Sequence, residues 1–351
     1  MTTFHHVLRR RFVFRFLAAW LAAGSMATVA MPAALAQEGS GAAAASRTPT
    51  GKVPAAVSVL SIVEHPSLDA LRDGLHDELK DAGYQDGKSL HWACQSAQGN
   101  QGTAVQIARK FVGDRPDVIV PIATPAAQAV VSATHQIPVV YNAITDPVAA
   151  QIVKSMAPSG TNVTGVSDKL VADRQVAFIK RVVPDVKRVG IIYSPAEANS
   201  VSTSREMKMA LEKQGISLVE VSAPRSVDVG QAAQRLVGKV DVIYTGNDNN
   251  VISAYESVIR VANAAKIPLI CADRSSVQRG ATGAMAIDYY RMGRQTGRMV
   301  LRILNGEKPG DIASETSDNL DITLNLEAAH RQGVTLSPEL QSEASEIFGK
   351  P

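Results

Sequence analysis

The sequence has 351 residues, of which 45% are hydrophobic and 20% charged, so it is long enough to bury the cores of two domains of ordinary size. It carries 36 Lys and Arg against 33 Asp and Glu, but four of the arginines lie in the first 36 residues, which contain no acid. Without that segment 32 basic residues face 33 acidic ones, a net charge of −1, which argues against nucleic acid or an anionic membrane as partner, because both require clustered Lys and Arg.

Residues 1–36 have the pattern of a secretory signal. Four arginines precede an apolar run that begins at Phe16, and the run is followed by the cleavage box Ala34-Leu35-Ala36. Gly24 lowers the hydrophobicity of this run, so the alternative interpretation of the segment as a membrane anchor is disfavoured. We therefore expect export to the periplasm, with the signal peptide cleaved after about Ala36.

The first half of the exported chain alternates apolar runs with amphipathic helices. Residues 37–52 are small and polar, so we expect a flexible leader there and folding from about Val53. The expected strands lie at 56–63, 117–123 and 137–144, and the expected helices at 67–82, 101–113 and 125–134. Because these runs are apolar on both faces, they predict a parallel sheet with helices on both sides.

The second half repeats this plan. Residues 239–244 and 267–270 echo residues 115–120 and 137–140 in sequence and in spacing. Strands are expected near 189–193, 217–221, 241–245 and 267–271, and helices near 172–182, 200–214, 228–237 and 250–265. The pattern predicts an α/β fold with two similar doubly wound parallel-sheet lobes.

Three crossings of the chain are expected to join these lobes as a hinge. The first crossing is placed at residues 162–166, the helix near 290–305 is assigned back to the first lobe, and the strand-like run 322–326 to the second. Lobe 1 is then 53–165 and 288–318, and lobe 2 is 166–287 and 319–351. Such a hinge lets two lobes open and close around a ligand.

Ligands of open parallel sheets bind beyond the carboxyl ends of the strands, so the loops that follow the strands hold the candidate site. Thr124-Pro125 and Asp146-Pro147 each predict a helix N-terminus, where free amides can hold a carboxylate. Asp248 and Asp273 follow strands of the second lobe and are candidates for binding an ammonium group. Donors facing acceptors favour a zwitterion, the pattern of an amino acid, although plain helix capping is the alternative for each of these residues.

Motifs for catalysis, metals or cofactors are missing from the sequence. There is no nucleophile elbow, phosphate-binding loop or dinucleotide-binding motif, and no Cys or His spacing typical of a metal site. We therefore expect no enzyme activity, no catalytic residue, no metal and no cofactor. Tyr141, Tyr193 and Tyr244 lie near the ends of expected strands, where they could line a side-chain pocket, although packing in the core is an equal alternative.

An ordered set of loop sequences resembles the ABC-transporter substrate-binding proteins of the TrpX type, a group with a periplasmic-binding-protein type I-like fold. The matching stretches are Glu64-His65-Pro66-Ser67-Leu68-Asp69, Ala123-Thr124-Pro125-Ala126-Ala127-Gln128, Thr145-Asp146-Pro147-Val148, Asn162-Val163-Thr164-Gly165-Val166-Ser167-Asp168, Glu197-Ala198-Asn199-Ser200, and Asp288-Tyr289-Tyr290 with Gly293-Arg294-Gln295-Thr296-Gly297. The resemblance covers residues 53 to about 335. Ala149 stands where the family often has Gly, and Asn247 and Asn250 stand where Thr is common.

The resemblance implies a solute-binding component of an ABC importer, which captures a small solute and delivers it to a membrane permease with its ATPase in the inner membrane. The expected solute class is the amino acids, aromatic ones included. Such a protein is expected to be a monomer. Carried over position by position, the ligand-contact candidates are Glu64, Thr124, Thr145, Asp146, Ser194, Asn199, Ser200, Asp248 and Asp273. The alternative with the same fold is a periplasmic ligand sensor that feeds a membrane receptor or kinase.

Overall fold

The computed structural model describes residues 49–317 and 320–350. The predicted signal peptide and most of the predicted leader lie outside these residues. The last part of that leader is packed rather than free: the Lys52 N–H donates to the Leu304 carbonyl over 2.9 Å, and the Thr50 hydroxyl donates to Asn305 over 3.1 Å. The packed part of the described chain therefore includes residues 50–52, a few residues before Val53.

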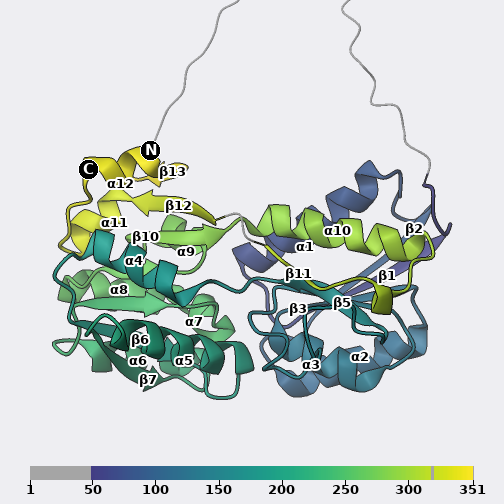
Figure 1. Ribbon diagram of the computed structural model, residues 1–351, viewed down its shortest axis with the longest axis horizontal. Coiled ribbons are helices and arrows are strands. Elements are labelled where there is room, and N and C mark those ends of the chain that lie inside the picture. Colours follow the sequence, from purple (N-terminus) through teal and green to yellow (C-terminus); the bar gives the residue numbers. More distant parts are fainter. Residues whose placement is uncertain (1–48, 318–319, 351) are drawn as a thin grey trace, which may run out of the picture. The chain divides into compact units, whose positions relative to one another are not determined.

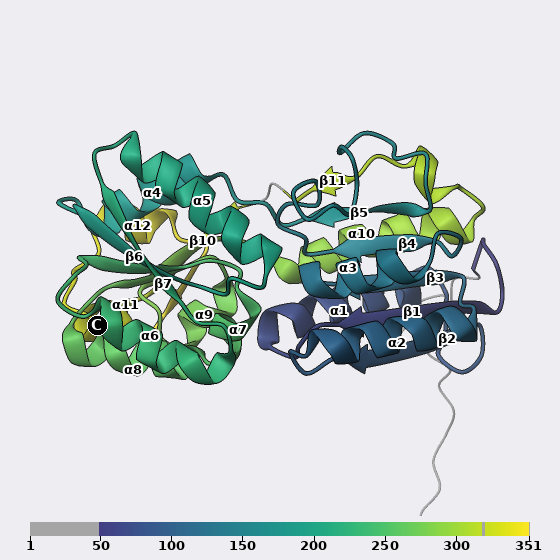
Figure 2. The same ribbon diagram turned by 90° about the horizontal axis from the view of Figure 1, so that it is seen from below.

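The first sheet has six parallel strands in the order β11-β5-β4-β3-β1-β2 (Figures 1 and 2). The strands are β1 (Ala55–Ser61), β2 (Leu90–Ser96), β3 (Val118–Ile122), β4 (Val139–Asn142), β5 (Val163–Ser167) and β11 (Glu315–Thr316). Every side chain of β3, β4 and β5 is buried, as expected for central strands covered on both faces.

Four helices cover this sheet: α1 (Pro66–Asp81), α2 (Gln101–Asp114), α3 (Thr124–Ala133) and α10 (Tyr289–Leu304). Helices α1 and α10 pack together on one face, and α2 and α3 on the other (Figure 1). The α1–α10 contact depends on glycine, because a Cβ at Gly293 would lie 2.0 Å from the Leu71 carbonyl oxygen, and one at Gly74 would lie 2.1 Å from that of Tyr290. This close approach holds α10 against α1.

The second sheet has seven strands in the order β13-β12-β10-β9-β8-β6-β7. Its described pairings are parallel except that of β10 with β12, so β12 and β13 run opposite to the other five strands. The strands are β6 (Arg188–Tyr193), β7 (Ser217–Ser222), β8 (Val242–Thr245), β9 (Leu269–Cys271), β10 (Gly283–Ile287), β12 (Leu320–Asn325) and β13 (Glu346–Phe348). The predicted strand near 322–326 thus belongs to the second sheet. The pattern did not predict β13 or the short helices α11 (Leu326–Arg331) and α12 (Pro338–Glu343) near the C-terminus.

The main helices of the second sheet are α4 (Ala172–Val182), α5 (Ala198–Glu212), α6 (Val229–Leu236) and α8 (Tyr255–Ala265), with α4 packed on α5 and α6 on α8 (Figure 2). Two short helices, α7 (Asn249–Ser253) and α9 (Arg274–Arg279), follow strand ends. The helix predicted at 250–265 is interrupted at Ala254, whose φ of −111° and ψ of 26° are not helical. The break leaves α7 as a separate turn of helix next to the candidate site.

The chain passes between the two sheets after β5, after β10 and between β11 and β12. The first crossing predicted at 162–166 is corrected, because residues 163–167 form the buried strand β5. We therefore propose lobe 1 as residues 49–167 and 288–317, and lobe 2 as residues 172–287 and 320–350, with residues 168–171 as the first crossing.

Candidate functional site

One small cavity is lined by residues that follow strands of both sheets. From the first sheet and α10 come His65, Leu68, Ala123, Thr124, Ala143, Thr145 and Tyr289; Asp168 lies in the first crossing; and Asn199, Asn247, Asn249 and Ile252 come from the second sheet. This is the place where the fold class binds ligands, beyond the carboxyl ends of the strands.

Four polar atoms at this cavity are buried and have no hydrogen-bond partner among the described residues. They are His65 Nδ1, Thr124 Oγ1, Asn199 Oδ1 and Asn247 Oδ1. An unsatisfied buried polar group costs about 1–3 kcal/mol, so native proteins contain few of them. Their concentration at one cavity indicates a site that binds a polar ligand.

Asp168 is the carboxylate of the cavity. It is 2% exposed and accepts hydrogen bonds from Thr145 Oγ1 at 2.9 Å, Tyr289 Oη at 2.8 Å and Asn247 Nδ2 at 2.9 Å. Burial raises its pKa, while these hydrogen bonds act in the opposite direction. Because Asn247 turns its NH2 toward this carboxylate, its carbonyl oxygen is the atom left without a partner.

Thr124 stands at the N-terminus of α3. The helix begins at Thr124 after Ala123, whose φ of 73° lies in the left-handed region, and no side chain caps the helix. The capping alternative for Thr124 is therefore wrong, and its hydroxyl stays free at the cavity. The first amides of α3 have no partner within the helix, so they and the positive end of the helix dipole favour an anion here.

His65 takes the place expected for Glu64. Glu64 is exposed and does not line the cavity, whereas His65 is 6% exposed and lines it. Burial lowers the pKa of His65 to about 4, so its imidazole is neutral at pH 7. The prediction selected Glu64, the charged residue of this loop, and missed its buried neighbour His65.

Asp248, Ser194 and Ser200 form a closed network inside the second lobe. The Asp248 carboxylate accepts from Ser194 N at 2.6 Å, Ser194 Oγ at 2.9 Å, Ser200 Oγ at 2.5 Å and Val251 N at 2.9 Å. None of the three lines the cavity. The expected ammonium contact of Asp248 is corrected by this geometry: its oxygens are occupied, and it caps α7.

Asp273 also differs from its expected role, because it joins the lobes instead of lining the cavity. Its Oδ1 accepts from Ser67 Oγ of α1 at 2.8 Å, and from Ser275 Oγ and Ser276 N of α9 at 2.6 and 2.9 Å. Its carboxylate is therefore engaged with serines from both lobes.

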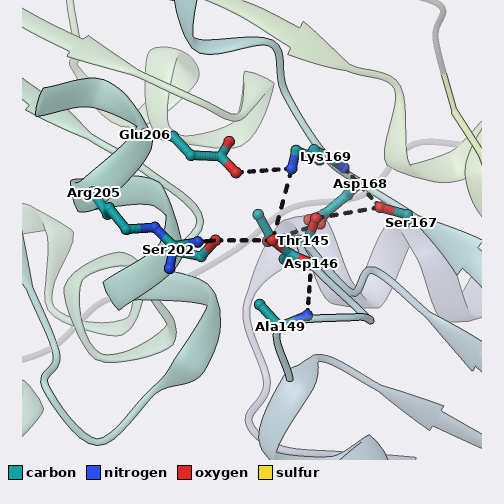
Figure 3. Close-up of polar contacts among 9 residues, drawn as sticks. All are labelled: Thr145, Asp146, Ala149, Ser167, Asp168, Lys169, Ser202, Arg205 and Glu206. Carbon is teal, nitrogen blue, oxygen red and sulfur yellow. Dashed lines mark hydrogen bonds and ion pairs between the residues drawn. The ribbon is translucent and has the colours of Figure 1, made fainter. Parts of the chain in front are cut away.

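Asp146 makes a second contact between the lobes (Figure 3). The helix predicted after Asp146-Pro147 is absent, and a turn takes its place, in which Asp146 Oδ1 accepts from Ala149 N at 2.9 Å. Asp146 Oδ2 accepts from Ser202 Oγ of α5 at 3.1 Å. Lys169, in the first crossing, lies 3.7 Å from Asp146 and 2.8 Å from Glu206 of α5.

Of the predicted site residues, the structure brings together Thr124, Thr145 and Asn199 at the cavity. The prediction missed His65, Asp168, Asn247, Asn249 and Tyr289, although His65, Asp168 and Tyr289 lie within the matching stretches quoted above. Tyr141 and Tyr244 do not line this cavity and are fully buried in the core. Within the described residues, no cluster of three or more His, Cys, Asp or Glu is arranged to hold a metal ion.

Two mainly parallel sheets whose strand ends meet at one polar cavity define a two-lobed binding protein. The chain belongs to the family of ABC transporter substrate binding proteins, because the model of that family matches residues 56–348. It is 38% identical over 288 residues to the tyrosine-binding protein of Clostridioides difficile (strain R20291), covering 82% of this chain and 84% of that protein.

Two solved structures are similar over nearly their whole length. A conserved domain protein from Vibrio cholerae O1 biovar El Tor has a TM-score of 0.83 and 46% identity, over 84% of this chain and 99% of that one. An ABC domain from Streptococcus pneumoniae in complex with L-Trp has a TM-score of 0.81 and 33% identity, again over 84% and 99%. These comparisons confirm the periplasmic-binding-protein type I-like fold and the resemblance to the TrpX type.

The family sets the class of function. Its members are substrate-binding proteins and not enzymes, they bind a small molecule, and they work with an ABC transporter. Proteins of this family are typically exported. In residues 49–317 and 320–350, no helix has both the length and the apolar composition needed to span a membrane.

Proposed function

We propose that this protein binds an aromatic L-amino acid as a zwitterion in the cavity between its two lobes. The observation that carries the proposal is the set of four buried polar atoms without partners at one cavity, beside the carboxylate of Asp168. A ligand with polar groups of both kinds would satisfy these atoms.

The arrangement of donors and acceptors supports an amino acid. Asp168, Asn199 Oδ1 and Asn247 Oδ1 are acceptors, which suit the three N–H donors of an ammonium group. The Thr124 hydroxyl and the first amides of α3 are donors and suit a carboxylate. Acceptors and donors thus approach the cavity from different elements, as a zwitterion requires.

The relatives support an aromatic side chain on that amino acid. One relative at 38% identity is a tyrosine-binding protein, and one solved relative at 33% identity holds L-Trp. The apolar part of the cavity, which includes Leu68, Ile252 and the ring of Tyr289, offers contacts for such a side chain.

Binding requires the lobes to part. The cavity has a volume of only about 10 Å³, close to the minimum for one water molecule. Entry of an amino acid must therefore open contacts such as Ser67–Asp273 and Ser202–Asp146, which join the lobes. The hinge of three crossings permits such a motion.

We further propose that the protein acts as a periplasmic monomer, exported with cleavage after about Ala36. It delivers the amino acid to an ABC permease and its ATPase in the inner membrane. The family membership supports a transport role of this kind.

A thermal-shift screen of purified mature protein against the common amino acids and simple sugars tests the proposal. A ligand that binds only the folded form raises the melting temperature by mass action. We expect L-Tyr, L-Trp or L-Phe to give the largest increase. An increase with a sugar and none with any amino acid would contradict the proposal.

A further inference from the structure

Glu197 is a buried carboxylate that does not line the cavity but contacts two residues that do. It is 6% exposed and lies just before α5, in the N-cap position. Its side chain makes no capping hydrogen bond to that helix. Helix capping therefore does not account for a carboxylate at this buried position.

The partners of Glu197 are the side-chain amides of Asn199 and Asn249. Its Oε2 accepts from Asn249 Nδ2 at 2.7 Å, from Asn249 N at 3.3 Å and from Asn199 Nδ2 at 3.1 Å. Asn199 Nδ2 also donates to the backbone carbonyl oxygen of Asn247 at 2.8 Å. A single carboxylate oxygen thus joins α5 to the start of α7, and both asparagines line the cavity.

An ionised carboxylate fixes which way an amide faces. It accepts hydrogen bonds and donates none, so a neighbouring Asn must turn its NH2 toward it and its carbonyl oxygen away. This is the arrangement at Asn199, whose Oδ1 is buried without a partner at the cavity. A rotated Asn199 amide would place its oxygen against the Glu197 carboxylate and its NH2 at the cavity, where it would repel an ammonium group.

We propose that Glu197 is a positioning residue that makes the site selective for a ligand with a protonated amine, by holding the Asn199 amide with its carbonyl oxygen toward the cavity. The inference rests on the proposed function and assigns the recognition of the α-ammonium group to the acceptors of the second lobe. Glu197 acts through Asn199 and does not itself contact the ligand.

The test compares two ligands, the best-binding aromatic amino acid and its desamino analogue, which keeps the ring and the carboxylate but lacks the amine. Calorimetry at about pH 8, where Glu197 is ionised although burial raises its pKa to about 7, gives the affinity of each for wild type, for Glu197→Gln and for Glu212→Gln. Glu212 is exposed at the far end of α5 and serves as the matched control. A glutamine at 197 can accept or donate, so of the two acceptors that now face the Asn199 NH2 only the Asn247 backbone carbonyl oxygen would still fix its direction.

In Glu197→Gln we expect the preference for the amino acid over the desamino analogue to fall by about tenfold or more, because a hydrogen bond to a charged group is lost. Binding of the desamino analogue should stay near the wild-type value, and Glu212→Gln should behave as wild type. Equal weakening of both ligands, or an unchanged preference, would overturn the inference.

Asn199→Ala keeps the test decisive if Glu197→Gln does not fold. It removes the acceptor and leaves Glu197 paired with Asn249, so it should lower the same preference. A wild-type preference in this variant would also overturn the inference. If the wild-type protein bound no amino acid, the proposed function itself would fail; if it did bind one and only the variants contradicted expectation, the role of Glu197 alone would fall.

Discussion

Asn247 Nδ2 donates to Asp168 Oδ2 over 2.9 Å, and this contact joins the loop after β8 of the second lobe to the crossing that follows β5 of the first. Thr145 and Tyr289 donate to the same carboxylate from the first lobe. Asp168 is therefore the point where both lobes and the crossing meet at the cavity. Removal of its charge should affect binding more than removal of any other carboxylate.

Asp168→Asn is expected to weaken amino-acid binding by about 2 kcal/mol or more, because a buried ammonium would lose its countercharge. Calorimetry measures the loss. Asp248→Asn is the matched control, since Asp248 is equally buried at 2% exposed but bonded within its own lobe. That variant should lower stability and leave the dissociation constant of the folded protein close to wild type. The reverse result would place the ammonium contact at Asp248.

Thr124→Val should weaken binding without destabilising the free protein. The Thr124 hydroxyl has no partner within the described residues, so an isosteric methyl group removes an unsatisfied buried atom and should be neutral or stabilising for folding. Binding should lose about 0.5–1.5 kcal/mol, the value of one hydrogen bond. Urea unfolding and calorimetry measure the two effects, and Thr124→Ser should keep wild-type affinity. A large loss of stability in Thr124→Val would mean that the hydroxyl serves the fold.

Lys169→Met should weaken binding through closure of the lobes and not through ligand contact. Lys169 links Asp146 of the first lobe to Glu206 of the second, and its side chain is 42% exposed (Figure 3). An exposed ion pair contributes about 0.2–1 kcal/mol, so we expect the affinity to fall by no more than about fivefold. The difference from wild type should vanish in about 1 M salt, where charges are screened. A difference independent of salt would exclude the electrostatic explanation.

The stability of Glu197→Gln relative to wild type should rise between about pH 4.5 and pH 7. Burial, and then the nearby Asp248 charge, raise the pKa of Glu197 from 4.5 to about 7. The stability that Glu197 contributes is therefore complete below pH 4.5 and is lost as the pH rises through about 7. Urea unfolding at about pH 5 and about pH 8 measures the change. A constant difference between the two proteins would show that Glu197 does not titrate in this range.

His65 makes stability change with pH in the opposite direction, and it does so in both wild type and Glu197→Gln. Burial lowers its pKa from 6.5 to about 4, so its contribution is complete above pH 6.5 and is lost as the pH falls through about 4. In wild type the two residues partly offset one another.

The sequence was sufficient to predict most strands and helices, because their apolar periodicity reflects burial in a parallel sheet. The strand at 117–123 and the helix at 67–82 agree with β3 and α1 to within about two residues. The break at Ala254 and the turn after Asp146 were not predictable from periodicity, because both depend on a single backbone conformation. The tail strand β13 is too short to carry a periodic signal.

The candidate site was harder to predict, because a loop sequence does not reveal which side chain faces inward. Glu64 and His65 are adjacent, yet only His65 is buried at the cavity. Asp248 was selected for its charge, but three of its four hydrogen-bond donors belong to Ser194 and Ser200, which only the folded chain brings close to it. Asp168 was missed because it lies in a crossing whose position was predicted a few residues too early.

Calorimetric titration of the wild-type protein with an aromatic amino acid, with its desamino analogue and with its carboxamide tests the central claim most directly. If acceptors around Asp168 bind the ammonium and donors at α3 bind the carboxylate, the intact amino acid should bind and each analogue should lose about tenfold or more in affinity. Equal affinity for all three ligands would show that the zwitterion is not what the cavity recognises.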